Sequence, residues 1–337
     1  MAGSPRNDFT WSRNTDTESI YGLIQYTDKK DLSRTDIMGL TAHAFRIIID
    51  REEVEVGSYS FFDWQLRHAE ALRNLGFTVR TTGRQNHVSP TPEELETALE
   101  MIQTSLDAGI PALSWDLFIP EWGVIYGYDD ETRMLQCRDV RRDSEMPYEK
   151  LGRGEVTELY LLTITDSKPV DRRTMLRGAL KLALEHAHVQ QFPAEESAGH
   201  ANGLAAFDAW IHAFEQRMAN PFGNAVNTGK VCDAREFAVQ FLQELADNGT
   251  EPGEESLRQL ARQAAAQYAI VAGNLSIMRD MFPFPHGGVP GDEAAATRSI
   301  ELLKEAKNAE TEGIALLAQM LELLEREAKA PVSKPGI

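Results

Sequence analysis

Two patterns of hydrophobic spacing divide the chain near residue 168. Before this point, short runs of β-branched and aromatic residues alternate with stretches of helical period. After it, apolar residues recur every three or four positions in segments rich in Ala, Leu, Glu and Gln. The pattern predicts an α+β domain over residues 18–166 and an all-α helical bundle over residues 170–330.

The first segment has signals for three helices and five strands. Thr91-Pro92-Glu93-Glu94 is a strong helix start, with a capping threonine, a proline in the first turn and acids at the positive helix end. The polar stretch 1–16 has no period, so we expect a frayed terminus. Helices are expected at 41–51, 63–75 and 91–108, and strands of a mostly antiparallel sheet at 77–81, 111–118, 123–128, 133–139 and 156–164.

The second segment predicts five helices. The last of them has a continuous apolar stripe that includes Leu302, Leu303, Leu316 and Leu317, as a helix in a bundle requires. The five helices are expected at 172–190, 203–218, 233–246, 255–281 and 292–328.

Charge and composition narrow the functional classes. The 337 residues include 52 acids and 34 bases, and the net charge is −18. Such a surface repels phosphate backbones and anionic membranes, so neither nucleic acid nor a membrane is an expected partner. No apolar run approaches the roughly 18 residues of a membrane span, and the N-terminal MAGSPRNDFTW lacks the apolar core of a secretory signal. We therefore expect a cytoplasmic protein.

Motifs for common cofactors are missing from the sequence. It contains no phosphate-binding loop, no dinucleotide-binding glycine motif, no His-Glu-x-x-His and no Gly-x-Ser-x-Gly. His186 and His188 are two positions apart and do not share a helix face. Neither a cofactor nor a metal site is therefore expected.

Three stretches resemble a known fold. They are Gly39–Phe45 (GLTAHAF), Asp107–Asp116 (DAGIPALSWD) and Pro120–Glu131 (PEWGVIYGYDDE). Together they span about residues 36–164 and resemble the papain-like cysteine peptidase fold. The similarity is greatest to the N-terminal domain of the butirosin-biosynthesis protein H family, which includes relatives of bacteriocin-processing peptidases. The bundle also looks like the helical part that follows this domain.

The resemblance implies a site with altered chemistry. In papain-like enzymes a cysteine opens the long helix, a histidine on a facing strand takes its proton, and a third polar residue orients the imidazole. The resemblance places Ala42 at the nucleophile position, Glu121 at the histidine position and Asp139 at the third. Neither cysteine replaces the missing thiol, because Cys137 is expected in the core and Cys232 near a bundle helix.

The leading hypothesis is therefore a catalytically inactive homologue that binds a peptide or a small acyl-type ligand in the remnant cleft. One alternative is a hydrolase or acyltransferase in which His43 and Glu121 are an acid–base pair; the same pair can instead be a salt bridge. Another alternative is a structural protein that forms a homodimer through its bundle. The two tryptophans next to the cleft either stack on a ligand or fill the core. The expected site residues are Thr41, Ala42, His43, Trp115, Asp116, Glu121, Trp122 and Asp139.

Overall fold

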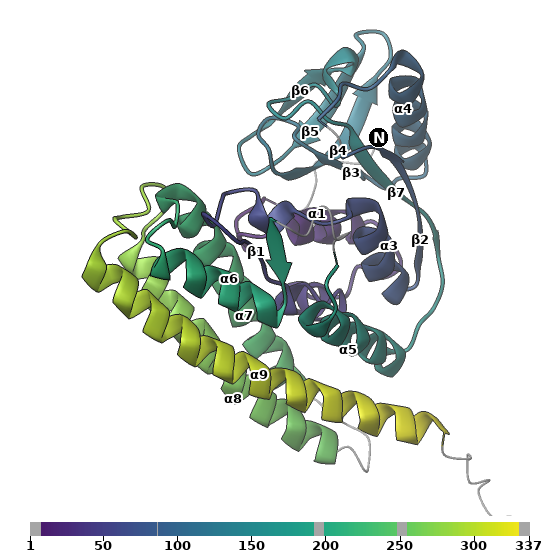
Figure 1. The fold of residues 1–337 in the computed structure, drawn as a ribbon. Helices are drawn as coiled ribbons and strands as arrows, with labels where there is room; N and C mark the ends of the chain where they lie inside the picture. Colours follow the sequence, from purple (N-terminus) through teal and green to yellow (C-terminus); the bar gives the residue numbers. More distant parts are fainter. Residues whose placement is uncertain (1–7, 86, 192–198, 248–254, 330–337) are drawn as a thin grey trace, which may run out of the picture. The chain divides into compact units, whose positions relative to one another are not determined.

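The chain folds into two compact units in the computed structural model, which describes residues 8–85, 87–191, 199–247 and 255–329. The first unit comprises Met1–Ile37 and Asp63–Val170, and the second comprises Met38–Phe62 and Asp171–Ile337. The first has an antiparallel sheet with helices, and the second is largely helical (Figure 1). The mixed α and β class predicted from the sequence is confirmed, while residues 38–62 group with the C-terminal helices.

The sheet of the first unit has six strands in the order β2-β7-β3-β4-β5-β6, and all neighbours are antiparallel. All five predicted strands are present. A sixth, β6, was missed because its sequence DSEMP is mostly exposed and has no apolar alternation. The strands are β2 (Phe77–Gly83), β3 (Ala112–Trp115), β4 (Trp122–Asp129), β5 (Met134–Arg138), β6 (Asp143–Pro147) and β7 (Tyr160–Ser167).

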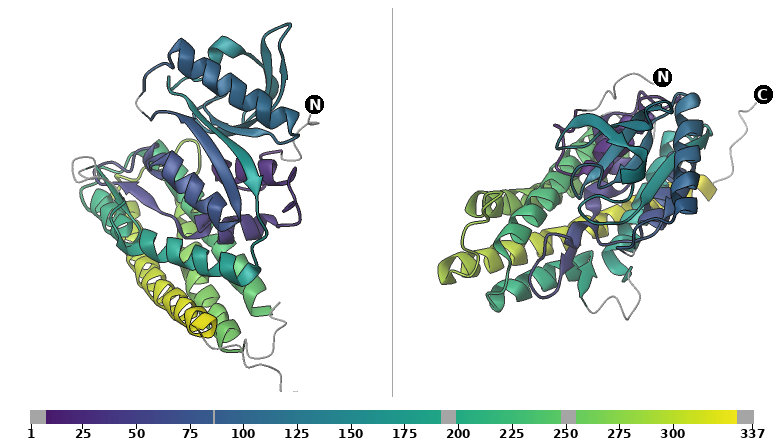
Figure 2. Two further views of the ribbon diagram at one scale, coloured as in Figure 1. Left: turned by 90° about the vertical axis from the view of Figure 1, so that its right-hand side faces the viewer. Right: turned by 90° about the horizontal axis from the view of Figure 1, so that it is seen from above.

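Helices pack on both faces of this sheet. Helix α4 (Pro92–Asp107) lies on one face of the sheet (Figures 1 and 2) and begins after the predicted capping residue Thr91, which forms a capping box with Glu94. Its apolar side chains belong to the same core cluster as Ile125 and Leu161. Helix α3 (Trp64–Asn74) packs against Trp122, which points to the opposite face because it lies three positions before Ile125 in β4. Both helices were predicted, and both are confirmed.

Helix α1 (Thr15–Ile24) was not predicted. It contacts β3 and β4, and its apolar residues Ile20, Leu23 and Ile24 are fully buried. The expectation of a frayed terminus is wrong for residues 8–16, because Phe9 and Asn14 are buried as well. Residues 1–7 lie outside the described part of the chain.

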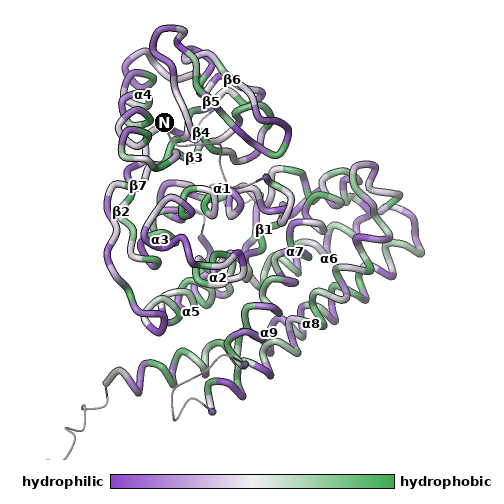
Figure 3. Tube along the Cα trace, turned by 180° about the vertical axis from the view of Figure 1, so that it is seen from behind, coloured by the Kyte–Doolittle hydropathy of each residue, from purple (hydrophilic) through white to green (hydrophobic). Residues whose placement is uncertain are grey.

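The second unit contains helices α5 to α9. Helix α8 lies beside both α7 and α9 (Figures 1 and 2). Hydrophobic positions recur along these helices between hydrophilic ones (Figure 3), and buried Leu303, Ala306 and Leu317 confirm the predicted stripe of α9. Helix α7 begins at Pro221, well before the predicted residue 233. The helices are α5 (Arg172–His188), α6 (Leu204–Glu215), α7 (Pro221–Asp247), α8 (Glu255–Met281) and α9 (Glu293–Lys329).

The prediction of a helix over residues 41–51 is wrong. Helix α2 (Arg34–Leu40) stops before this segment, which forms the short 3₁₀ helix η1 (His43–Phe45) and then strand β1 (Ile48–Asp50). Ala42 has a left-handed backbone with φ of 61°, which a continuous helix does not allow. Strand β1 pairs with β8 (His200–Asn202), a partner about 150 positions away in sequence.

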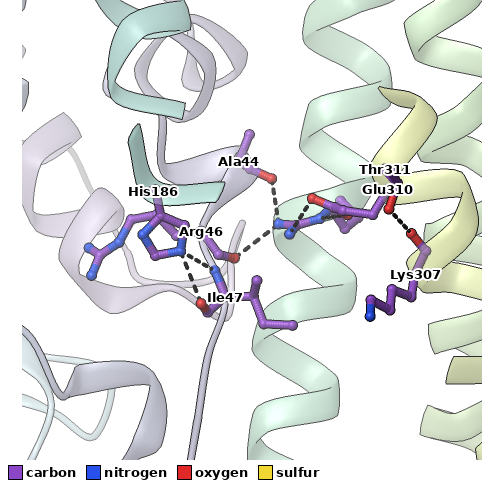
Figure 4. Close-up of polar contacts among 8 residues, drawn as sticks. Ala44, Arg46, Ile47, His186, Lys307, Glu310 and Thr311 are labelled. Atoms are coloured by element: carbon purple, nitrogen blue, oxygen red, sulfur yellow. Dashed lines mark hydrogen bonds and ion pairs between the residues drawn. The ribbon is translucent and has the colours of Figure 1, made fainter. Parts of the chain in front are cut away.

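Two buried polar side chains hold the segment 43–47 against the helices of the second unit (Figure 4). Arg235 of α7 donates hydrogen bonds of 2.9 Å to the carbonyl oxygens of Ala44 and Arg46, and it forms a bidentate ion pair with Glu310 of α9. Nε2 of His186 in α5 accepts a hydrogen bond of 3.0 Å from the backbone N–H of Ile47. Burial, together with the charge of Arg46, lowers the pKa of His186 to about 3, so its imidazole is neutral.

Candidate functional site

An unusual run of buried polar side chains marks the start of α1. Asn14 is the N-cap residue, and Thr17 Oγ1 donates a hydrogen bond to its carbonyl oxygen. The carboxylate of Glu18 accepts hydrogen bonds of 2.9 Å from the backbone N–H groups of Trp11 and Ser12, which fixes the chain that enters the helix. Each of the six residues from 14 to 19 is at most 4% exposed. Buried polar groups on this scale need organised partners, and they often belong to functional sites.

Thr15 joins the start of α1 to the start of β4. Its hydroxyl donates a hydrogen bond of 2.5 Å to Oε2 of Glu121 and accepts one of 3.2 Å from the backbone N–H of Trp122. The loop before β4 positions Glu121, whose carbonyl oxygen accepts a hydrogen bond from the N–H of Asp116. A hydroxyl and a carboxylate therefore meet at the positive end of a helix, where negative charge is favoured.

Three tryptophans surround the start of β4. Trp115 and Trp122 are opposite each other in the β3–β4 pair, and each ring lies within 5 Å of the ring of Trp64. Nδ1 of His68 is 2.9 Å from the hydroxyl of Tyr160 beside them. The indole Nε1 of Trp115 is buried and has no hydrogen-bond partner in the described residues. The tryptophans fill the core of the first unit, where an unsatisfied donor is costly.

The two predicted acids next to this cluster stabilise loops. The Asp139 carboxylate accepts hydrogen bonds from three backbone N–H groups, those of Phe118, Arg141 and Arg142. Asp116 follows β3 with a left-handed φ of 53°, and its Oδ2 accepts a hydrogen bond of 2.6 Å from the N–H of Val156. Burial raises the pKa of both carboxyls. The described hydrogen bonds give Asp139 a structural role in the β5–β6 turn.

The residues expected at the nucleophile position lie elsewhere in the fold. Thr41, Ala42 and His43 belong to the second unit, where Thr41 and Ala42 lie between α2 and η1 and His43 begins η1, and no long helix starts there. His43 is 2% exposed, and its ring centroid is 6.4 Å from that of Tyr59. The placement of Ala42 at the mouth of a long helix is therefore wrong. The expected pairing of His43 with Glu121 stays a prediction.

Neither cysteine is available as a nucleophile. Cys137 lies in β5 and is completely buried, and burial raises the pKa of its thiol well above the usual value. Burial raises the pKa of Cys232 in α7 to about 12, and the charge of Glu236 adds to this rise. A thiolate is the reactive form of cysteine, and neither thiol forms one near neutral pH.

The sequence did contain a signal for α1 that the prediction missed. Polar Asn14 and Thr15 precede Glu18, a spacing typical of helix N-termini, and Ile20, Leu23 and Ile24 follow at helical spacing. What the sequence does not show is that Thr15 meets Glu121, 106 positions later.

Comparisons with known proteins do not assign the chain to a family: no protein-family model matches it, and no curated protein matches it either. In the described residues, no helix is both long and apolar enough to cross a membrane.

Proposed function

We propose that this protein is a catalytically inactive relative of the papain-like fold, without a thiol at the nucleophile position, that binds a peptide or a small acyl-type ligand beside Thr15 and Glu121. The observation that carries this proposal is the hydrogen bond between the Thr15 hydroxyl and the Glu121 carboxylate at the start of α1. In papain-like enzymes the start of a helix and a facing strand hold the nucleophile and its base, and in this proposal α1 and β4 would take these places instead of the segment at Ala42. The resemblance would assign the third position to Asp139, which follows the next strand, β5.

The chemistry of these groups supports non-covalent binding. A carboxylate, a hydroxyl and the N–H groups of a helix N-terminus can bind the amide N–H and carbonyl groups of a peptide. The neighbouring Trp115 offers an indole donor. Because both thiols are buried and protonated, thioester chemistry has no nucleophile here.

A second function is favoured by the direction of the same hydrogen bond. Since Thr15 donates to Glu121, the carboxylate is placed to take the hydroxyl proton, and the oxygen of Thr15 would then attack an ester or amide carbonyl. This is hydrolase or acyltransferase chemistry with Glu121 as the general base. In the alternative from the sequence analysis, Glu121 instead forms an acid–base pair with His43.

Variants of the two residues separate these functions. We would screen peptides and acyl amides or esters for binding by ligand-observed NMR, and for turnover by mass spectrometry. Thr15→Val, Glu121→Gln and wild type would be compared with Glu131→Gln, an exposed acid in the same unit. Loss of a charged hydrogen bond costs about 1.5–3 kcal/mol, so Glu121→Gln should weaken ligand binding about 10- to 150-fold.

Each outcome decides between the hypotheses. Binding without turnover that Glu121→Gln weakens and Glu131→Gln does not would support the binding function. If wild type turns over a substrate, both site variants abolish this turnover and an acyl adduct forms on Thr15, the protein is an enzyme and the hypothesis of a catalytically inactive homologue is refuted. Turnover that needs His43 but survives Thr15→Val would favour the His43–Glu121 pair. If a ligand binds but none of the variants changes its affinity, the proposed site is refuted.

A further inference from the structure

The second unit brings together three metal-ligating side chains from distant parts of the sequence. Asp50 at the end of β1 lies directly opposite His200 at the start of β8 in the register of the two-stranded sheet. Glu55 is five residues further along the loop that follows β1. One donor atom of each residue, two carboxylate oxygens and an imidazole nitrogen, lies within 4.8 Å of the other two.

The loop that presents Glu55 is held firmly. The carbonyl oxygen of Glu55 accepts hydrogen bonds from Ser58 Oγ at 2.7 Å and from Asn227 Nδ2 of α7 at 2.8 Å. At Gly223 in α7 the helix approaches this loop so closely that a Cβ would be 2.2 Å from the carbonyl oxygen of Val54. The position of Glu55 is therefore set by α7 as well as by β1.

The side chains of Asp50 and His200 are also oriented by their neighbours. Oδ1 of Asp50 accepts hydrogen bonds from the backbone N–H groups of Glu52 and Glu53, at 3.1 and 2.7 Å. The ring of His200 stacks on that of Phe61, with centroids 3.8 Å apart and an angle of 7° between the planes. Such supporting contacts fix the ring plane and the carboxylate direction, as they do around known metal ligands.

We propose that Asp50, Glu55 and His200 bind a divalent transition-metal ion of the zinc class. The distance between His200 Nε2 and Glu55 Oε1 is 3.6 Å, too long for a hydrogen bond. It suits two ligands of one ion, because donors at 2.0–2.2 Å from a tetrahedral zinc lie about 3.3–3.6 Å apart. One imidazole with two carboxylates favours zinc, manganese or iron over the all-oxygen sites of calcium.

The electrostatics of the cluster agree with a bound cation. One carboxylate oxygen of Asp50 and one of Glu55 lie within 4.8 Å of each other, so the two acids repel each other when both are ionised. A cation between them relieves this repulsion. Three protein ligands leave a position for water or for a substrate oxygen. This inference concerns the second unit and does not depend on the function proposed for Thr15 and Glu121.

Zinc titration tests the site directly. Full-length protein without a histidine tag would be dialysed against EDTA and titrated with ZnCl₂ by calorimetry, and with CoCl₂ by visible absorption. We expect one ion per chain and the spectrum of a low-coordinate cobalt site. His200→Ala and Glu55→Gln should each weaken binding at least tenfold, since loss even of supporting residues costs about 10- to 100-fold. His286→Ala, which removes an exposed histidine of the same unit, should leave binding unchanged.

The Glu55→Gln variant keeps the test valid if the buried His200→Ala variant is unstable, because the Glu55 side chain is 57% exposed. Thermal melts of all variants would be recorded without metal. No saturable zinc binding by wild type would overturn the proposal. Zinc binding that survives both substitutions, or that His286→Ala weakens equally, would also overturn it. Binding of Mg²⁺ but not Zn²⁺ would exclude the imidazole as a ligand.

Discussion

Glu310→Gln should destabilise the protein severely although it changes only one atom and the charge of one side chain. Glu310 and Arg235 are 3% and 0% exposed, and both carboxylate oxygens accept hydrogen bonds of 2.8 Å from the guanidinium. Burial raises the pKa of Glu310, and the charge of Arg235 opposes this rise. In the variant the guanidinium stays charged and buried without a counterion, which costs about 3–5 kcal/mol.

The structure also predicts how the pair behaves in a double-mutant cycle. Arg235 donates to the carbonyl oxygens of Ala44 and Arg46 as well as to Glu310. Arg235→Met therefore leaves two backbone acceptors unsatisfied, at about 1–3 kcal/mol each, in addition to an unpaired acid. The double variant Arg235→Met with Glu310→Gln should cost at least about 2 kcal/mol less than the sum of the single variants. It should nevertheless remain less stable than wild type, because the two acceptors are still unsatisfied.

Urea denaturation followed by circular dichroism at 222 nm measures these differences, since the long helices lie in the second unit. The matched control is Glu305→Gln, an exposed acid on the same helix, which should stay within about 0.5 kcal/mol of wild type. A Glu310→Gln variant within 1 kcal/mol of wild type would refute the reasoning. So would strict additivity in the cycle, because it would mean that the two side chains do not interact.

Two further predictions concern packing and pH. Gly39→Ala should lower the free energy of unfolding, measured by heat or urea, by about 1–3 kcal/mol, because the new Cβ would lie 2.2 Å from the ring of Phe241. Gly273→Ala places its Cβ in open space and should stabilise α8 by up to about 1 kcal/mol. Equal effects of the two substitutions would contradict this reasoning. The pKa of His186 is about 3 in the folded protein, whereas an unperturbed histidine has a pKa near 6.5. Between these two pH values only the unfolded state binds a proton at this imidazole, so stability is lost as the pH falls through that window. The difference in unfolding free energy between wild type and His186→Gln should therefore shrink on acidification by at most about 1.4 kcal/mol per pH unit. A difference that stays constant would disprove the buried neutral imidazole.

The sequence determined the elements whose signals are local. Helix α4 was predicted with its capping residue Thr91, because the capping threonine, the proline and the acids all lie within its first turn. Helices α8 and α9 were predicted almost to the residue, since their apolar stripes extend over many turns. The central strands of the sheet were found because they are buried, apolar and bounded by turn residues.

Only the tertiary structure decided the segment from residue 38 to 62. The apolar run at residues 41–51 resembles a helix, but it forms the 3₁₀ helix η1 and strand β1 instead, and these are stabilised by groups far away in sequence, namely β8, Arg235 and His186. The same holds for both candidate sites. Thr15 meets Glu121, and Asp50 meets His200, through pairings of strands and helices that no local pattern encodes. Local propensity comes from neighbours within a few residues, whereas a site needs contacts between residues that only folding brings together.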